Sequence, residues 1–96
     1  MRRDQNQAVI VAALRDAGAT VTILAGVGGG CPDLLVGWRG QNYLLEVKNP
    51  AGRGDLLTEA EQHFKVIWRG QLAIVHDIDE ALAELEEINE NQAQLG

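Results

Sequence analysis

Cysteine, aromatic residues and long apolar runs are scarce in this sequence, and each scarcity excludes a class of protein. Cys31 is the only cysteine, which rules out a secreted scaffold held by internal disulfides. Aromatic residues make up 4% of the chain, so no ladder of rings for stacking single strands is present. No apolar run approaches the roughly 18 residues of a spanning helix. Polar residues follow Arg2 and Arg3 where a signal peptide needs its apolar segment, so we expect a cytoplasmic protein without a membrane partner.

Positive charge is also scarce. Eight Lys and Arg against fourteen Asp and Glu give a net charge of −6, which argues against a protein held to nucleic acid by its overall charge. The balance changes along the chain, because residues 1–54 hold six basic and four acidic residues, whereas residues 55–96 hold two and ten. A polyanionic partner would therefore meet the first part of the chain and be repelled by the last.

Apolar residues nevertheless make up 46% of the chain, enough to pack one core. The length of 96 residues predicts a single domain over residues 1–96, with a core over about residues 4–88 and a frayed C-terminal tail. The sequence contains no internal repeat, linker or low-complexity stretch.

Hydrophobic periodicity predicts three helices and four strands. Pairs with the spacing of a capping box, Thr58 with Glu61 and Asp77 with Glu80, mark the starts of two helices. The helices are expected over residues 4–17, over residues 58–69 and from residue 77 onward, and the strands over residues 20–25, 33–38, 42–48 and 71–76. The order α-β-β-β-α-β-α predicts an α/β fold, with a mixed four-stranded sheet flanked by helices.

Three polar residues occur where an ordinary buried strand would hold apolar ones. Glu46 and Lys48 stand two positions apart in an apolar strand and therefore share one face, and Asp33 begins the preceding strand. A two-residue turn at Arg39-Gly40 would pair Asp33 with Glu46, whereas a turn at Gly40-Gln41 would pair it with Lys48. Both registers place the three side chains on the same face, within about 5 Å between opposite Cβ atoms.

Two carboxylates this close repel each other, so the site needs positive charge. Lys48 supplies one charge, and a hard divalent cation such as Mg²⁺ or Mn²⁺ would supply two more. A metal beside a lysine is suited to phosphodiester hydrolysis. A Glu-x-Lys pair alone is more typical of a surface salt bridge than of a functional site, but the Pro-Asp pair at Asp33, thirteen residues before Glu46, favours a functional site.

The segment Gly30-Cys31-Pro32-Asp33, followed by Glu46-Val47-Lys48 and a helix with Gln62, resembles the motifs of the PD-(D/E)xK nuclease superfamily. Within it, the sequence is most similar to the VRR-NUC group of stand-alone, phage-type nucleases related to Holliday-junction resolvases. The resemblance covers roughly residues 4–82 and implies a restriction-endonuclease-like fold. It further implies that Asp33, Glu46 and the main-chain carbonyl of Val47 bind Mg²⁺ or Mn²⁺, and that Lys48 activates the water or stabilises the transition state.

The resemblance also implies two further residues near the site. The family counterpart of Gln62 lies close to it, although a helical wheel puts Gln62 opposite the apolar stripe of its own helix. Family members often carry an acid in the first helix, for which Asp4 and, in amide form, Gln7 are the candidates.

Nucleic-acid contacts are expected from a glycine loop and from isolated cations. The loop matches neither a Rossmann fingerprint nor a P-loop, so no organic cofactor is expected. It is consistent either with a plain connection or with close approach of a nucleic-acid backbone. The candidate contacts are Gly28, Gly29, Gly30, Arg53, Lys65 and Arg69.

Together these observations predict a metal-dependent endonuclease that hydrolyses DNA. With no room for a sequence-reading domain, we expect selectivity for branched or junction DNA, a homodimer joined through residues 4–17, and a product with a 5′-phosphate as the family implies. One alternative is a non-catalytic module on the same fold that binds nucleic acid or a protein. Another is a purely structural acidic domain.

Overall fold

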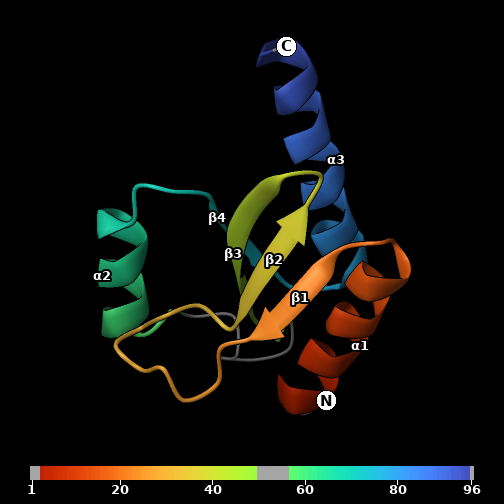
Figure 1. The fold of residues 1–96 in the computed structure, drawn as a ribbon. Coiled ribbons are helices and arrows are strands. Elements are labelled where there is room, and N and C mark those ends of the chain that lie inside the picture. The colour runs from red at the N-terminus through yellow and green to blue at the C-terminus, as the bar shows by residue number, and fades with distance from the viewer. Residues whose placement is uncertain (1–2, 50–56, 96) are drawn as a thin grey trace.

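The computed structural model describes residues 3–49 and 57–95 and, within them, the side chains of residues 5–49 and 57–87. Its element order is helix, three strands, helix, strand, helix, as the hydrophobic pattern predicts (Figure 1). The helices are α1 (Arg3–Asp16), α2 (Glu59–Ile67) and α3 (Ile78–Leu95); the strands are β1 (Thr20–Ile23), β2 (Leu34–Trp38), β3 (Gln41–Val47) and β4 (Leu72–Val75). The prediction of an α/β domain with a mixed four-stranded sheet is confirmed.

The sheet has the strand order β1-β2-β3-β4. β2 is antiparallel to both β1 and β3, and β4 runs parallel to β3 after the chain has passed through α2. Trp38 pairs with Gln41, so Arg39-Gly40 forms the turn between β2 and β3. Both turn residues have positive φ, 49° and 81°, as a type I′ turn requires. Of the two registers left open by the sequence, the structure has the one that pairs Asp33 with Glu46.

The core lies between one face of the sheet and the two helices α1 and α3 (Figure 1). Alternate residues of β2 and β3 point to this face, and α1 contributes three buried side chains, including Val11 from outside its main apolar stripe. The largest fully buried side chains are Ile10, Leu14, Leu34, Val36, Leu45, Val47 and Val75. Because β3 is filled by apolar residues on this face, its other face presents Glu46 toward α2.

Several elements are shorter than predicted, and two of them end two residues early. The strand over residues 20–25 ends at Ile23, because the chain leaves the sheet and turns at Gly26, whose φ is 88°. The helix over residues 58–69 ends at Ile67, because Trp68 has extended backbone geometry with ψ of 125°. Within the described ranges, no helix combines the length and apolar character that crossing a bilayer requires.

Candidate functional site

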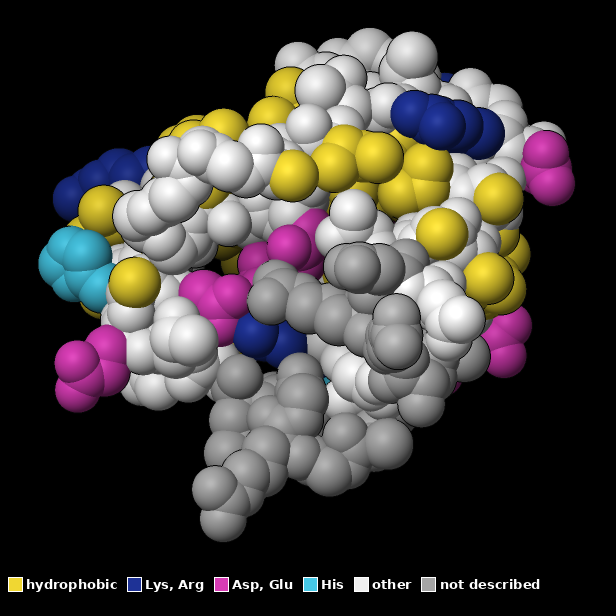
Figure 2. All heavy atoms as spheres, turned by 90° about the horizontal axis from the view of Figure 1, so that it is seen from below, with side chains coloured by type: hydrophobic (Ala, Val, Ile, Leu, Met, Phe, Trp, Pro, Cys, Tyr) yellow, Lys and Arg dark blue, Asp and Glu magenta, His cyan; other side chains and the backbone are white. Residues whose placement is uncertain are grey.

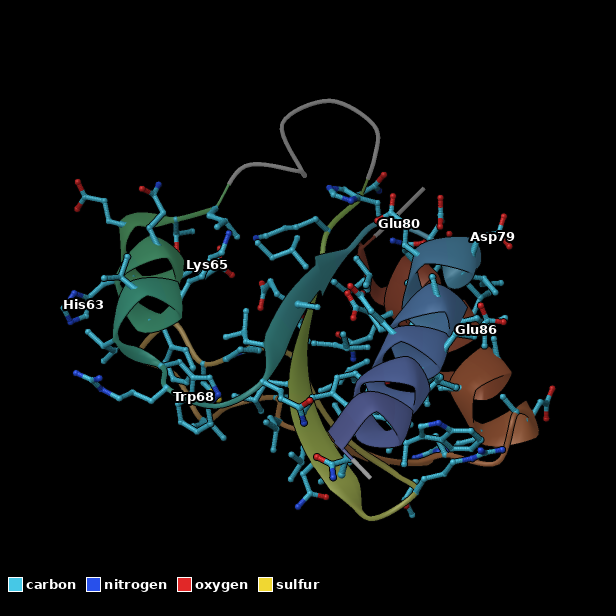
Figure 3. All side chains as sticks on the ribbon, turned by 90° about the horizontal axis from the view of Figure 1, so that it is seen from above. His63, Lys65, Trp68, Asp79, Glu80 and Glu86 are labelled. Carbon is cyan, nitrogen blue, oxygen red and sulfur yellow. The ribbon has the colours of Figure 1, made fainter. Side chains whose placement is uncertain are left out.

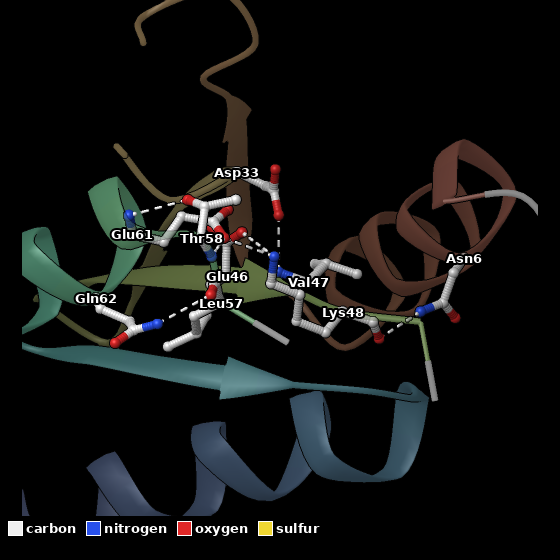
Figure 4. Close-up of polar contacts among 9 residues, drawn as sticks. All are labelled: Asn6, Asp33, Glu46, Val47, Lys48, Leu57, Thr58, Glu61 and Gln62. Atoms are coloured by element: carbon white, nitrogen blue, oxygen red, sulfur yellow. Dashed lines mark hydrogen bonds and ion pairs between the residues drawn. The ribbon is translucent and has the colours of Figure 1, made fainter. Parts of the chain in front are cut away.

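The two acids predicted for the site meet where β2 begins and β3 approaches its end. The register that pairs Leu34 with Leu45 places Asp33 opposite Glu46. Asp33 Oδ2 accepts a hydrogen bond of 2.8 Å from the backbone N–H of Val47, which ties this carboxylate to β3 (Figure 4). The sheet geometry therefore brings Asp33 and Glu46 together, as the strand pattern predicts.

Lys48 lies on the same face, held between two carboxylates. Its Nζ is 2.7 Å from Glu61 Oε1 and 3.4 Å from Glu46 Oε1. Lys48 is 5% exposed and Glu46 is 3% exposed, so both ionisable groups are removed from water. Removing one member of such a buried pair typically costs about 3–5 kcal/mol, because the other charge stays buried without a partner. The three side chains form one electrostatic unit in a hollow where acidic and basic groups gather (Figure 2).

Glu61 is a member of this unit that the sequence analysis did not assign to the site. It is the third residue of α2, where its Oε1 accepts from Thr58 N at 2.8 Å while Thr58 Oγ1 accepts from Glu61 N at 3.2 Å. The sequence analysis identified this capping box as the start of a helix, and the capping role was a sufficient explanation for a glutamate at position 61. Only the position of α2 beside β3 shows that the same oxygen also accepts from Lys48.

Gln62, by contrast, is exposed, and its side chain donates to the carbonyl of Leu57 at 3.1 Å. The structure thus places Glu61, rather than its neighbour Gln62, against Lys48 (Figure 4). The helical wheel, which put Gln62 opposite the apolar stripe, agrees with this exposure.

The pKa values of the two glutamates are shifted in opposite directions. Burial raises the pKa of Glu46 to about 8, assisted by a hydrogen bond with Glu61 and by the negative charge of Asp33. Burial also acts to raise the pKa of Glu61, but hydrogen bonds from Glu46, Lys48 and Thr58 lower it to about 2. The Glu46 carboxyl therefore keeps its proton near neutral pH and donates it to the ionised Glu61. The site holds more acid than Lys48 alone can neutralise.

Helix α1 reaches the same end of the sheet through Asn6, which the sequence analysis also missed. Its Nδ2 donates to the carbonyl of Lys48 at 3.2 Å (Figure 4) and to that of His76 at 3.1 Å, and so joins α1 to the chain just beyond β3 and β4. Asn6 is buried. An asparagine at a position on an otherwise apolar helix face is the sequence signal that could have identified it, because buried polar groups need hydrogen-bond partners. The side chain of Asp4 lies outside the described residues, and Gln7 is only partly buried.

The donor atoms at this site fit a small hard cation. Among the described residues, no cluster of three His, Cys, Asp or Glu has the arrangement of a metal centre. Mg²⁺, however, usually takes only one or two protein carboxylates and keeps several waters. The N–H and carbonyl of a strand residue point to the same side, so the Val47 carbonyl faces the Asp33 side. Continued beyond Leu34–Leu45, the register places Pro32 opposite Val47. Proline has no N–H, so Pro32 cannot donate a hydrogen bond to the Val47 carbonyl.

The glycines and cations predicted to contact nucleic acid are not gathered in one place. An added Cβ would meet nothing at Gly28 or Gly29, whereas at Gly30 it would clash with the carbonyl of Ala60 in α2. Lys65 lines a narrow crevice between α2 and the sheet together with Glu46 and Glu61. The other two predicted basic contacts are Arg69, which follows α2, and Arg53, which lies outside the described residues.

The candidate site thus consists of Asp33, Glu46, the Val47 carbonyl, Lys48 and, from α2, Glu61. Neither protein-family models, nor curated protein sequences, nor solved structures gave a match to this chain.

Proposed function

We propose that this protein is a metal-dependent nuclease of the PD-(D/E)xK type that hydrolyses phosphodiester bonds in DNA. The observation that carries the proposal is a β2–β3 register which, continued one residue beyond Leu34–Leu45, puts Asp33 across from Glu46, on a face where Lys48 Nζ lies 3.4 Å from Glu46. A structural salt bridge needs one acid for one lysine. A second and a third carboxyl group add repulsion that a folded chain has no need to keep.

Asp33, Glu46 and the Val47 carbonyl are the residues that would hold Mg²⁺ or Mn²⁺. When bound, the ion supplies charge to polarise a phosphoryl oxygen and to lower the pKa of the attacking water. Asp33 is already oriented for this task by its hydrogen bond from Val47 N. The carboxyl groups of Asp33 and Glu61 lie close enough to Glu46 to act on its charge, and such a concentration of acid favours a cation there.

Lys48 is positioned to donate a hydrogen bond to the substrate. An ammonium group has three N–H donors; among the described residues, one bonds Glu61 and a second faces Glu46 in an ion pair. The third is left for the attacking water or a phosphate oxygen, whose charge grows in the transition state. Glu61 acts through Lys48 as a positioning residue, because its Oε1 is in turn held by the backbone N–H of Thr58.

The preferred substrate is branched or junction DNA, and the active form is a homodimer that presents two sites to two strands. Within α1, Val11 is buried in the protomer, so a dimer surface on this helix would use Val9 and Ala12, which are exposed.

The direct test is cleavage of labelled duplex, single-stranded, flap and four-way-junction DNA, with Mg²⁺, Mn²⁺ or EDTA, by the wild type and Lys48→Ala. We expect metal-dependent cutting that Lys48→Ala lowers by at least about 10²-fold, the usual loss when one donor to the transition state is removed. Glu86→Gln, at an exposed site on α3, is the matched control and should cut normally. Cutting that persists in EDTA or in Lys48→Ala overturns the mechanism, and no cutting of any substrate favours the non-catalytic module.

Glu61→Gln tests the positioning role. Glutamine still completes a capping box, but it no longer offers Lys48 a charged partner. We expect kcat to fall about tenfold while KM changes little. Thr58→Ala is the control, because it removes the cap, at about 1 kcal/mol of stability, and keeps the Lys48–Glu61 ion pair. Equal losses of kcat in the two variants would mean that Glu61 matters only through the helix start.

A further inference from the structure

The C-terminal end of α2 exposes three consecutive apolar residues. Val66 is 82% exposed, Ile67 55% and Trp68 44%, and α2 has no buried residue at all. We call these three residues the apolar tip of α2. Most exposed apolar side chains on a small protein are scattered singly and need no explanation. A continuous set at the end of a helix is the kind of surface that marks a binding site.

Positive charge is concentrated around the apolar tip. Lys65 and Arg69 flank it, and they are the only Lys or Arg in residues 55–96, against ten acidic residues. Lys65 projects from the side of α2 that faces the sheet, and His63 lies on the opposite side (Figure 3). In a chain of net charge −6, two cations beside an exposed apolar surface are complementary to a polyanion with apolar parts.

An aromatic pair joins the apolar tip to the candidate site. The rings of Phe64 and Trp68 are stacked, with centroids 5.3 Å apart and planes 18° from parallel. Phe64 also lines the crevice that holds Glu46 and Glu61. The pair therefore continues the candidate site toward the end of α2, and its outer member, Trp68, is partly exposed.

We propose that the apolar tip of α2 binds unpaired nucleobases of the substrate, with Trp68 stacking on a base and Lys65 and Arg69 contacting the neighbouring phosphates. Every base has a flat π-face, so stacking needs no particular sequence, but a base inside a duplex is already stacked. The proposal rests on the proposed nuclease function and narrows its substrate to DNA with an unpaired segment beside the scissile bond.

The helix geometry sets the distance of that segment from the bond. Seven positions separate Glu61 from Trp68, which at 1.5 Å per residue is about 10 Å. A strand that is still paired in a duplex rises roughly 3.4 Å per nucleotide, so one that follows α2 covers this distance in about three nucleotides. We therefore expect cleavage about three nucleotides from the point where pairing stops.

Tryptophan fluorescence tests the inference without requiring activity. In the Trp38→Phe variant, Trp68 is the only tryptophan, and it is titrated in EDTA with a thymidine oligonucleotide or with a blunt hairpin of equal length. We expect quenching by the single strand alone. If Trp38→Phe is poorly folded, the difference between wild type and Trp68→Phe reports the same signal.

Affinity provides the second measurement. Trp68→Ala should weaken binding of the single strand about tenfold, within the range for loss of one stacked base. Ile78→Asp is the matched control, because Ile78 is an exposed apolar residue at the start of α3, and it should bind as the wild type does. Quenching with the expected loss supports the inference even if no DNA is cut. Lys48-dependent cleavage without quenching, or a tip that mediates self-association instead, overturns the inference and leaves the nuclease proposal standing.

Discussion

The Glu46 carboxyl is almost completely buried and lies opposite Asp33 and beside Lys48 and Glu61. Glu61 carries the negative charge of the hydrogen-bonded glutamate pair because it also accepts from Lys48 and from Thr58 N. Glu46 is the more deeply buried member, and its contact with Lys48 Nζ is the longer one, at 3.4 Å against 2.7 Å for Glu61. Burial and position, rather than residue type, therefore separate the pKa values of two chemically identical side chains.

The raised pKa of Glu46 predicts a pH dependence of stability. Its ordinary pKa is 4.5 and its folded value about 8, so between these values the folded state holds a proton that the unfolded state has lost. The free energy of unfolding should therefore fall as the pH rises from about 4.5 to 8. Urea unfolding in EDTA across this range measures the slope. Glu46→Gln should flatten it, whereas Glu86→Gln should not, and a wild-type stability that rises through this window would contradict the prediction.

The pattern of residues alone was enough to predict that Asp33, Glu46 and Lys48 share one face of the sheet. Side chains in a strand alternate between faces, so their shared face follows from spacing alone. The sequence analysis missed Glu61 and Asn6 because both contact Lys48, which belongs to a different element. Glu61 is 13 positions from Lys48 in the sequence, and Asn6 is 42 positions from it. Local sequence carries no signal for contacts of that kind.

At the scale of elements, α2 is the least embedded part of the described structure. Its nine residues include none that is buried, although its capping box is complete. Among the described residues, the features that hold it near the sheet include the ion pair between Glu61 and Lys48 and the close approach of Gly30 to Ala60. The position of α2, and with it Glu61, thus depends on a few contacts rather than on a large apolar interface.

Gly30→Ala should therefore displace α2. The new Cβ would clash with the backbone of Ala60, and the φ of 78° adds the left-handed strain of about 1–2 kcal/mol. Gly29→Ala is the control, because it has the same strain at φ of 65° but open space around the Cβ. We expect the larger loss of stability in thermal unfolding, and the larger loss of cleavage, from Gly30→Ala. Equal effects would show that only backbone strain matters.

The β2–β3 hairpin shows how an element resolves an ambiguity in the sequence. Two registers kept Asp33, Glu46 and Lys48 on one face, and the turn residues decided between them. Arg39 adopts a positive φ of 49°, which is unusual for a residue other than glycine, asparagine or aspartate. Its guanidinium lies 5.0 Å from the Trp38 ring centroid, a cation–π contact that helps to offset this cost.

On the scale of the whole molecule, the sheet separates the basic end of α2 from the acidic helix α3. α2, with Lys65 and Arg69, lies on one side, and α3, with Asp79, Glu80 and Glu86, lies on the other (Figure 3). A negatively charged ligand at α2 is thereby kept away from most of the acid responsible for the net charge of −6. At physiological salt the Debye length is about 8 Å, so charge beyond the sheet is largely screened.

This separation predicts a shallow salt dependence of DNA binding. If about three Lys or Arg side chains contact phosphates, a plot of the logarithm of the binding constant against the logarithm of the salt concentration should have a slope of roughly −2 to −3. Lys65→Ala should reduce the slope by about one. Glu86→Gln should leave affinity unchanged at physiological salt and raise it only at low salt. Fluorescence anisotropy with labelled DNA measures both, and a slope steeper than about −5 would contradict the prediction.

The sequence by itself determined the order of the elements and the common face of Asp33, Glu46 and Lys48, because helical and strand periodicities are local properties of the chain. Tertiary structure decided the register of the hairpin, the joining of Glu61 to Lys48 and the exposure of the α2 tip. These features depend on how segments far apart in the chain pack together. That packing is set by backbone approach at Gly30 and by burial of charge, which residue spacing does not record.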